Sequence, residues 1–244
     1  MQLTSLFKLI LLSLTLIISA PSHANDAYDP FIDYSEYDDN GDEEADVNFF
    51  KNGKQFTLHF VGGYRGLTGE LGAKVYDPAI SYGLGLNFFM DLRLAIQFHY
   101  ILSNHNYEFN DTLNNEYEGS SNFHDLGLSI KYYINTQNVI RNLAKLNPYL
   151  LLGFSYVNRV TKASTSNADT SSKLFDSTAG YGANLGGGFE IQMSNKKFYI
   201  GGEAIYQLVT FEDEGTEITP LNNPTGIHPN GDLWRVSALV GINF

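Results

Sequence analysis

Large apolar residues occupy every second position in eight separate segments of the chain, and small or polar residues stand between them. A period of two is typical of a β-strand whose two faces meet different surroundings. A helix would instead repeat its apolar residues every three or four positions. The alternation therefore predicts eight strands, at residues 56–60, 80–88, 92–100, 126–134, 150–156, 181–191, 198–208 and 234–244.

The connections between these segments alternate in length. Short connections follow the second, fourth and sixth segments, at 90–91, 135–146 and 194–197. Long polar connections follow the first, third, fifth and seventh, at 65–77, 103–119, 158–176 and 212–231. Outer-membrane barrels have short turns on the periplasmic side and long loops outside, so the lengths favour this architecture.

The two faces of the predicted strands differ in kind. One face is bulky and continuously apolar, whereas the other carries glycine, small polar residues and charges. A small soluble barrel fills its interior with apolar side chains, but an outer-membrane barrel turns its apolar face to lipid and its polar face to the lumen. Aromatic residues near the segment ends suit the membrane–water interfaces. We therefore predict an all-β fold, an eight-stranded antiparallel transmembrane β-barrel of up-and-down topology.

The start of the chain has the features of a secretory signal peptide. Lys8 provides a positive charge, residues 9–18 are almost wholly apolar, and small residues at Ser22 and Ala24 mark a cleavage site. A membrane anchor would need about 20 apolar residues, and this run is shorter. We predict a signal peptide at 1–24 and export through the Sec pathway to the outer membrane.

Residues 25–50 are strongly acidic, with ten Asp and Glu and no Lys or Arg. Such a segment buries too little apolar surface to fold alone, so we predict that it is disordered, lies in the periplasm and precedes a barrel at 51–244. Its aromatic residues are spaced like contacts for an unknown periplasmic partner, and a solvated leader is the simpler interpretation. Residues 38–42 begin like a calcium loop, but Glu43 stands where the loop needs glycine and Phe49 stands where it needs its final carboxylate, so we predict no metal site.

Composition excludes several classes of function. Lys and Arg number 15 against 27 Asp and Glu, which gives a formal net charge of −12. Proteins that bind nucleic acid need a basic face, so no nucleic-acid partner is expected. The chain has no Cys, which excludes disulfides, thiol catalysis and Cys-ligated zinc.

The last residues of the chain follow a pattern that is known from a family of membrane proteins. Val240, Ile242 and Phe244 alternate with smaller residues, and the aromatic Phe244 is the last residue. With the eight-segment pattern, this ending resembles the small eight-stranded outer-membrane barrel superfamily of Gram-negative bacteria, which includes OmpA-, OmpX- and OmpW-like domains. The resemblance implies that these three residues form the signal read by the barrel-assembly machinery. It also implies periplasmic termini, four external loops and outer-membrane lipids as surroundings.

The polar face of the predicted strands carries charges of both signs. A charge that faces a narrow lumen without a partner is costly, so oppositely charged residues are expected to pair. We predict a lumen ion-pair network that plugs the barrel, formed by Arg93, Asp125, Lys131, Glu190, Glu203 and Arg235.

Two functional interpretations follow for such a barrel. The first is a structural protein with a plugged lumen that makes surface contacts. The second is a narrow channel or a carrier of a small apolar ligand. Inward-facing glycines would leave a cavity for the carrier, or would simply give room to neighbouring side chains; they are Gly83, Gly85, Gly127, Gly186 and Gly188.

A third interpretation is a lipid-modifying enzyme. Nucleophilic catalysis needs a Ser beside a His whose other nitrogen meets a carboxylate. Ser103 near His105, and His124 beside Asp125, are the local candidates, with both His in or near predicted outer loops. Neither pair matches a lipid-modifying motif, so we predict no catalytic residue, no enzyme activity and no cofactor.

Overall fold

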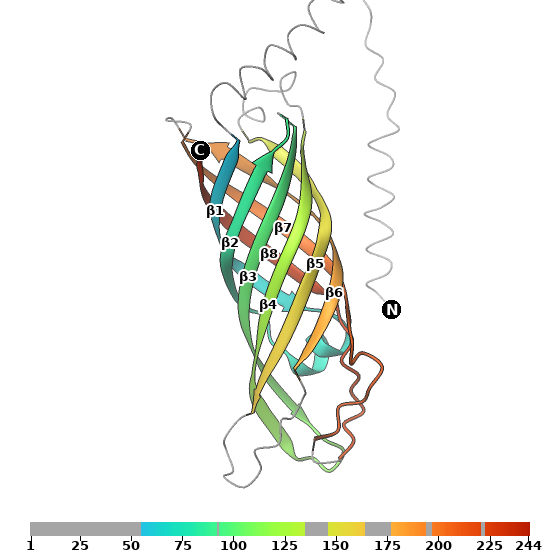
Figure 1. Ribbon diagram of the computed structural model, residues 1–244. Coiled ribbons are helices and arrows are strands. Elements are labelled where there is room, and N and C mark those ends of the chain that lie inside the picture. The colour runs from blue at the N-terminus through green and yellow to red at the C-terminus, as the bar shows by residue number, and fades with distance from the viewer. Residues whose placement is uncertain (1–54, 92, 135–145, 164–176, 194–196, 221–222) are drawn as a thin grey trace, which may run out of the picture. The chain divides into compact units, whose positions relative to one another are not determined.

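The computed structural model describes residues 55–91, 93–134, 146–163, 177–193, 197–220 and 223–244. These residues form one closed barrel of eight antiparallel strands, in which each strand pairs with its neighbours in the chain and β1 closes onto β8 (Figure 1). The predicted eight-stranded all-β fold is confirmed. The strands are β1 (Phe56–Leu67), β2 (Ala79–Phe89), β3 (Leu94–Asn110), β4 (Glu116–Tyr133), β5 (Pro148–Ala163), β6 (Thr178–Gln192), β7 (Phe198–Phe211) and β8 (Leu233–Asn243).

A short π-helix, η1 (Leu71–Val75), lies in the connection between β1 and β2. No helix within the described ranges is long and apolar enough to cross a membrane. The predicted signal peptide at 1–24 and the predicted acidic segment at 25–50 lie outside the described residues. We call the end of the barrel that holds η1 and the β3–β4 turn the loop end, and the end that holds the C-terminus the terminal end (Figure 1).

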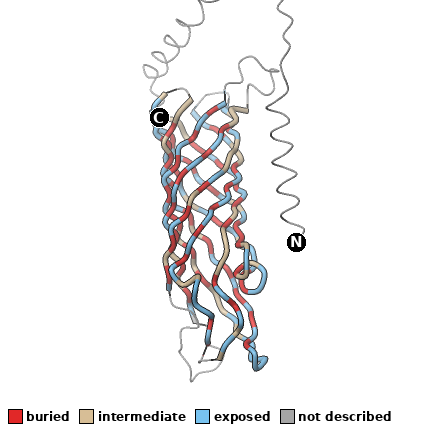
Figure 2. The backbone as a smooth tube through the Cα atoms, turned by 90° about the vertical axis from the view of Figure 1, so that its right-hand side faces the viewer, coloured by how far each residue is buried: buried red, intermediate tan, exposed pale blue. Residues whose placement is uncertain are grey.

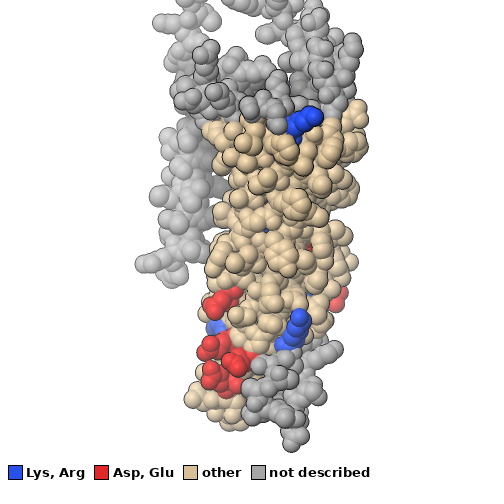
Figure 3. All heavy atoms as spheres, turned by 90° about the vertical axis from the view of Figure 1, so that its left-hand side faces the viewer, with Lys and Arg blue, Asp and Glu red and all other residues tan. Residues whose placement is uncertain are grey.

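Burial alternates along the strands (Figure 2), and the exposed positions in the middle of the barrel carry large apolar side chains. Phe154 is 75% exposed and Ile80 is 68% exposed, whereas Arg65 and Asp125 are fully buried inside the barrel. This is the reverse of a soluble barrel and the arrangement of a barrel whose outer face meets lipid. Figure 3 shows the broad uncharged band on one face, with acidic side chains gathered towards the loop end.

The predicted long loop at 103–119 is wrong, because most of it is strand. β3 and β4 remain paired as far as Asn110 and Glu116, and only residues 111–115 turn between them. Beyond the apolar band the two faces exchange character: Glu108 points outward, and Tyr107 and Phe109 are buried inside. The outward residues become polar there, and the sequence pattern consequently resembled a loop.

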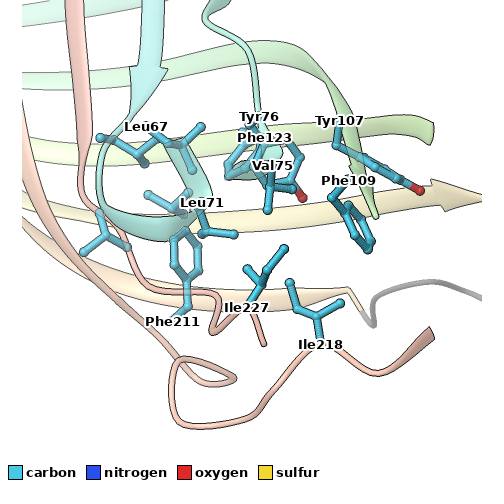
Figure 4. Close-up of a cluster of buried hydrophobic side chains, with 13 residues drawn as sticks. Leu67, Leu71, Val75, Tyr76, Tyr107, Phe109, Phe123, Phe211, Ile218 and Ile227 are labelled. Carbon is cyan, nitrogen blue, oxygen red and sulfur yellow. The ribbon is translucent and has the colours of Figure 1, made fainter. Parts of the chain in front are cut away.

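A cluster of buried apolar side chains, here called the mouth cluster, fills the barrel at its loop end (Figure 4). Its members come from strands, from η1 and from the connection between β7 and β8. The mouth cluster consists of Leu67, Leu71, Val75, Tyr76, Tyr107, Phe109, Phe123, Val157, Val209, Phe211, Ile218, Ile227 and Leu233. Burial of this apolar surface stabilises the closed mouth.

Hydrogen bonds fasten the β7–β8 connection over this cluster. The Leu71 N–H donates to the carbonyl oxygen of Asn230 at 3.1 Å, and the His228 N–H donates to Oε2 of Glu70 at 2.7 Å. The Lys74 ammonium and the His228 N–H hold the pKa of the Glu70 carboxyl below its ordinary value. Thr112 N–H, in the β3–β4 turn, donates to the Pro224 carbonyl oxygen at 3.1 Å. Three of the connections at the loop end therefore form one cap.

Candidate functional site

The first group of lumen charges comes from four strands. Lys131 Nζ on β4 lies 3.2 Å from Oε1 of Glu190 on β6 and 3.7 Å from Oε2 of Glu203 on β7. Arg235 Nη2 on β8 lies 2.9 Å from Oε1 of Glu203. The Tyr149 hydroxyl donates to Oε2 of Glu203 at 3.0 Å. Glu203 thus joins two cations and one hydroxyl at a position with almost no solvent exposure.

The second group is centred on Asp125. Its Oδ2 lies 3.1 Å from Nη2 of Arg65 and accepts a hydrogen bond from Nε2 of Gln207 at 2.9 Å. Arg65 Nη2 also donates to Oε1 of Gln207 at 2.9 Å, so the three side chains close a ring of contacts. Oδ1 of Asp125 lies 3.7 Å from Nε2 of His99. This group spans the lumen between β1, β3, β4 and β7.

The structure places the six predicted network residues in two different environments. Asp125, Lys131, Glu190, Glu203 and Arg235 are all buried in the lumen. Arg93 lies in the turn before β3 and is partly exposed. Its backbone N–H and that of Leu94 both donate to Oδ1 of Asp91 at 2.6 Å, and these bonds shape the turn.

Arg65 is one of the buried cations that the sequence pattern does not place in the lumen. The sequence pattern predicts a first strand that ends at 60 and a loop that begins at 65. β1 continues to Leu67, however, and Arg65 is in phase with the inward residues Thr57 and His59. Continuation of the period of two through the glycines at 62 and 63 was the signal that would have placed it in the lumen.

The charges within the two groups balance. Three cations, Arg65, Lys131 and Arg235, lie against three anions, and the anions are Asp125, Glu190 and Glu203. Each buried charge needs a partner to offset the cost of leaving water. Because the groups pair internally, these six residues give the lumen no net charge for a passing ion to meet.

A further buried ion pair lies at the mouth. Arg159 on β5 is fully buried, pairs with Asp213 and lies with its guanidinium 5.2 Å from the centre of the Phe211 ring. The Tyr76 hydroxyl and Ser121 Oγ lie 2.9 Å apart in the same region. Polar and charged side chains are therefore interleaved with the apolar side chains of the mouth cluster at the loop end.

No protein-family model and no curated protein matches the chain. Among solved structures, the outer membrane protein OprG from Pseudomonas aeruginosa is 14% identical, covers 79% of this chain and 98% of its own, and has a TM-score of 0.50. The N-terminal β-barrel domain of Pseudomonas aeruginosa OprF is 18% identical over 79% of this chain and 99% of its own, with a TM-score of 0.43. Neisserial surface protein A is 14% identical over 78% and 97%, with a TM-score of 0.46. The chain has the fold of a small Gram-negative outer-membrane β-barrel.

An aromatic belt fits this outer-membrane barrel. Seven of the eight strands place a Tyr or Trp on the outside near the loop-side limit of their apolar run, and β4 places a His there. Amphipathic rings favour the interface between lipid and water. The belt consists of Tyr64, Tyr82, Tyr100, His124, Tyr156, Tyr181, Tyr206 and Trp234.

Several lumen glycines of the barrel are covered by rings from the neighbouring strand. A Cβ at Gly127 would lie 2.2 Å from Cε1 of His99, which is its paired residue on β3. The absence of a side chain at Gly127 therefore makes room for the His99 ring. Aromatic rings commonly cover a glycine on the neighbouring strand of a sheet in this way. The same arrangement covers these positions: Gly85 by His59, Gly188 by Tyr149 and Gly241 by Tyr199. These glycines accommodate neighbours and leave no space of their own for an apolar ligand.

The structure separates one candidate catalytic pair and brings the other together. Adjacent residues of a strand face opposite sides, so Asp125 is buried in the lumen while His124 faces outward. His105 is a buried residue of β3 rather than a loop residue. Its Nδ1 donates to the Asp77 carbonyl oxygen at 2.8 Å, and its Nε2 lies 3.1 Å from Ser103 Oγ.

The Ser103–His105 pair has the geometry of a nucleophile and its base, but it is enclosed. Ser103 is 3% exposed, His105 is 0% exposed, and the Phe123 ring of the mouth cluster packs edge-on against His105. A substrate has no route to Ser103 in this arrangement. Over the described part of the chain, no three His, Cys, Asp or Glu residues are grouped closely enough to hold a metal ion.

We predict that Glu203→Ala lowers the free energy of unfolding by about 3–5 kcal/mol, because Lys131 and Arg235 lose a buried partner. The matched control is Glu212→Ala, at an exposed position just beyond β7. Urea unfolding in lipid vesicles, followed by heat-modifiable gel mobility, measures both variants. Equal losses in the two variants would contradict the network.

We also predict that Gly127→Ala destabilises the barrel by about 1–3 kcal/mol, because the new methyl group displaces the His99 ring in a packed lumen. Gly62→Ala is the control, since a Cβ there meets nothing within 4 Å. The same unfolding assay compares them. A loss no larger in Gly127→Ala than in Gly62→Ala would show that the lumen has room to spare.

Proposed function

We propose that this protein is a non-enzymatic, integral outer-membrane barrel that is plugged along its axis and presents its loop end for contacts at the cell surface. The observation that carries the proposal is closure at two levels. The lumen charges pair with one another, and the mouth cluster seals the loop end with apolar side chains. A barrel filled in this way suits anchoring and surface contact better than passage of solutes.

Orientation and assembly form part of the same proposal. The loop end faces outward, the termini lie in the periplasm, and the barrel-assembly machinery reads Val240, Ile242 and Phe244 after Sec export. Exposure of Val240 (54%) on the outer face of β8 and of Phe244 (61%) directly after β8 supports this role.

A narrow channel is the second candidate. Several lumen side chains have polar atoms that are buried without a hydrogen-bond partner among the described residues, including Asn87 Oδ1, Gln97 Oε1 and Ser129 Oγ. Buried polar atoms of this kind call for water. A hydrated lumen would conduct small ions if the ion pairs parted.

Planar-bilayer recording distinguishes the two candidates. We expect no steady conductance steps from the protein purified from outer membranes, because both the lumen and the mouth are filled. Heat-modifiable gel mobility of the same sample verifies that the barrel is folded, and an open porin in the same bilayer verifies the recording. Steady steps from the folded protein would overturn the plugged barrel in favour of the channel.

A further inference from the structure

Two lumen arginines stand directly opposite each other on neighbouring strands. Arg65 of β1 and Arg235 of β8 are cross-strand partners, and they are 0% and 3% exposed. Each pairs with a carboxylate from another strand, Asp125 on β4 and Glu203 on β7. Side chains at opposite positions of an antiparallel pair have Cβ atoms about 4.5–5.5 Å apart, and like charges placed in this way repel each other. The register of β1 and β8 therefore brings two buried positive charges together.

The two arginines retain donors that the ion pairs do not use. Arg65 contacts Asp125 and Gln207 through Nη2, and Arg235 contacts Glu203 through Nη2. Nε and Nη1 of Arg65 and Nε of Arg235 are buried without a hydrogen-bond partner among the described residues. A buried guanidinium N–H without a partner is costly, because the group has lost its hydration. These three nitrogens therefore call for an acceptor that the lumen side chains do not supply.

Two serine hydroxyls beside the arginines also lack a partner. Ser81 of β2 and Ser237 of β8 both pair in register with Gly63, which is the inward neighbour of Arg65 on β1. Their Oγ atoms are buried without a hydrogen-bond partner among the described residues. A Cβ at Gly63 would lie 2.9 Å from Oγ of Ser237, so the glycine leaves room for this hydroxyl. All five partnerless atoms of this patch belong to groups that can donate a hydrogen bond.

The chemistry of this patch favours an anion over water. A buried water makes about three hydrogen bonds and accepts only some of them, so the five donors would need several waters. An anion accepts from every donor around it, and it also offsets the repulsion between the two guanidinium groups. The three lumen carboxylates already balance the three lumen cations. A small anion with a single charge therefore fits better than sulfate or phosphate.

We propose that the lumen binds one small monovalent anion, of which chloride is the physiological example, between Arg65 and Arg235. The anion accepts hydrogen bonds from the partnerless guanidinium nitrogens and from the hydroxyls of Ser81 and Ser237. It leaves the ion pairs of both arginines in place, because it uses the donors that those pairs do not. The site goes beyond the plugged barrel, since it assigns a ligand to the lumen, and it does not depend on contacts at the cell surface.

Crystals grown with bromide in place of chloride locate the anion directly. Bromide scatters anomalously, and we expect an anomalous difference peak within hydrogen-bond distance of Nε of both Arg65 and Arg235. Density at this place without an anomalous signal would show that water satisfies the donors, and it would overturn the proposal.

The stability of the folded protein provides a test in solution. A ligand that binds only the folded state raises stability as its concentration rises. The urea midpoint of unfolding in lipid vesicles is measured while chloride replaces gluconate, a bulkier anion, at constant ionic strength. We expect the midpoint to rise with chloride concentration. Equal midpoints in chloride and gluconate would overturn the proposal.

Variants locate the anion within the lumen. Arg235→Lys keeps a cation beside Glu203 but removes the guanidinium donors, and Ser237→Ala removes one hydroxyl. Each variant should need about tenfold more chloride for the same rise in midpoint, because a hydrogen bond to a charged group is lost. Ser129→Ala is the control, since its hydroxyl is also buried and partnerless but pairs in register with Gln97 on another part of the lumen wall.

Heat-modifiable gel mobility checks the fold of every sample, so failure of the barrel is separated from failure of the site. Unchanged chloride dependence in folded Arg235→Lys and Ser237→Ala would overturn the proposal. The bilayer recording described above separates this site from the plugged barrel. A steady anion conductance that Arg235→Lys abolishes would support the site and overturn the plug, whereas a silent bilayer with chloride-independent stability would do the reverse.

Discussion

Closure of β1 onto β8 is the constraint on which the rest of this structure depends. A strand in lipid has no water to satisfy its backbone N–H and carbonyl groups, so every one of them must pair within the sheet. Eight strands that close completely meet this requirement and leave no free edge. The closed sheet then has an outer face that must be apolar and a narrow interior that must be filled.

The interior is filled by charged side chains that neutralise one another as ion pairs. Arg65, Lys131 and Arg235 would each be unfavourable alone in the lumen, but each lies against a carboxylate. Ring-covered glycines allow large residues such as His99 to fit inside eight strands. The mouth cluster then closes the loop end with apolar contacts, in a region where the outer face has already become polar.

The sequence predicted the part of the fold that lies at membrane depth, because there one period of two holds from end to end of each strand. It failed beyond the apolar band. Tyr107 and Phe109 turn inward while Glu108 turns outward, and this exchange of faces hid the outer half of β3 and β4. The same failure placed His105 in or near a loop, whereas Arg65 was left out of the lumen because the glycines at 62 and 63 interrupt the apolar alternation of β1.

The remaining features depend on contacts between distant segments, which a strand pattern does not contain. Leu71, Ile218 and Ile227 meet in the mouth cluster although two connections carry them. The contacts of Arg65 with Asp125 and Gln207 join three strands, and the register of these strands determines which side chains meet.

A double-mutant cycle on Arg65 and Asp125 shows whether the lumen charges stabilise the barrel as pairs. The free energy of unfolding is measured for Arg65→Met, for Asp125→Leu and for the two together. We expect a loss of about 3–5 kcal/mol for each single change and a much smaller loss than their sum for the double variant, because no buried charge is then left alone. Simple addition of the two losses would contradict this expectation.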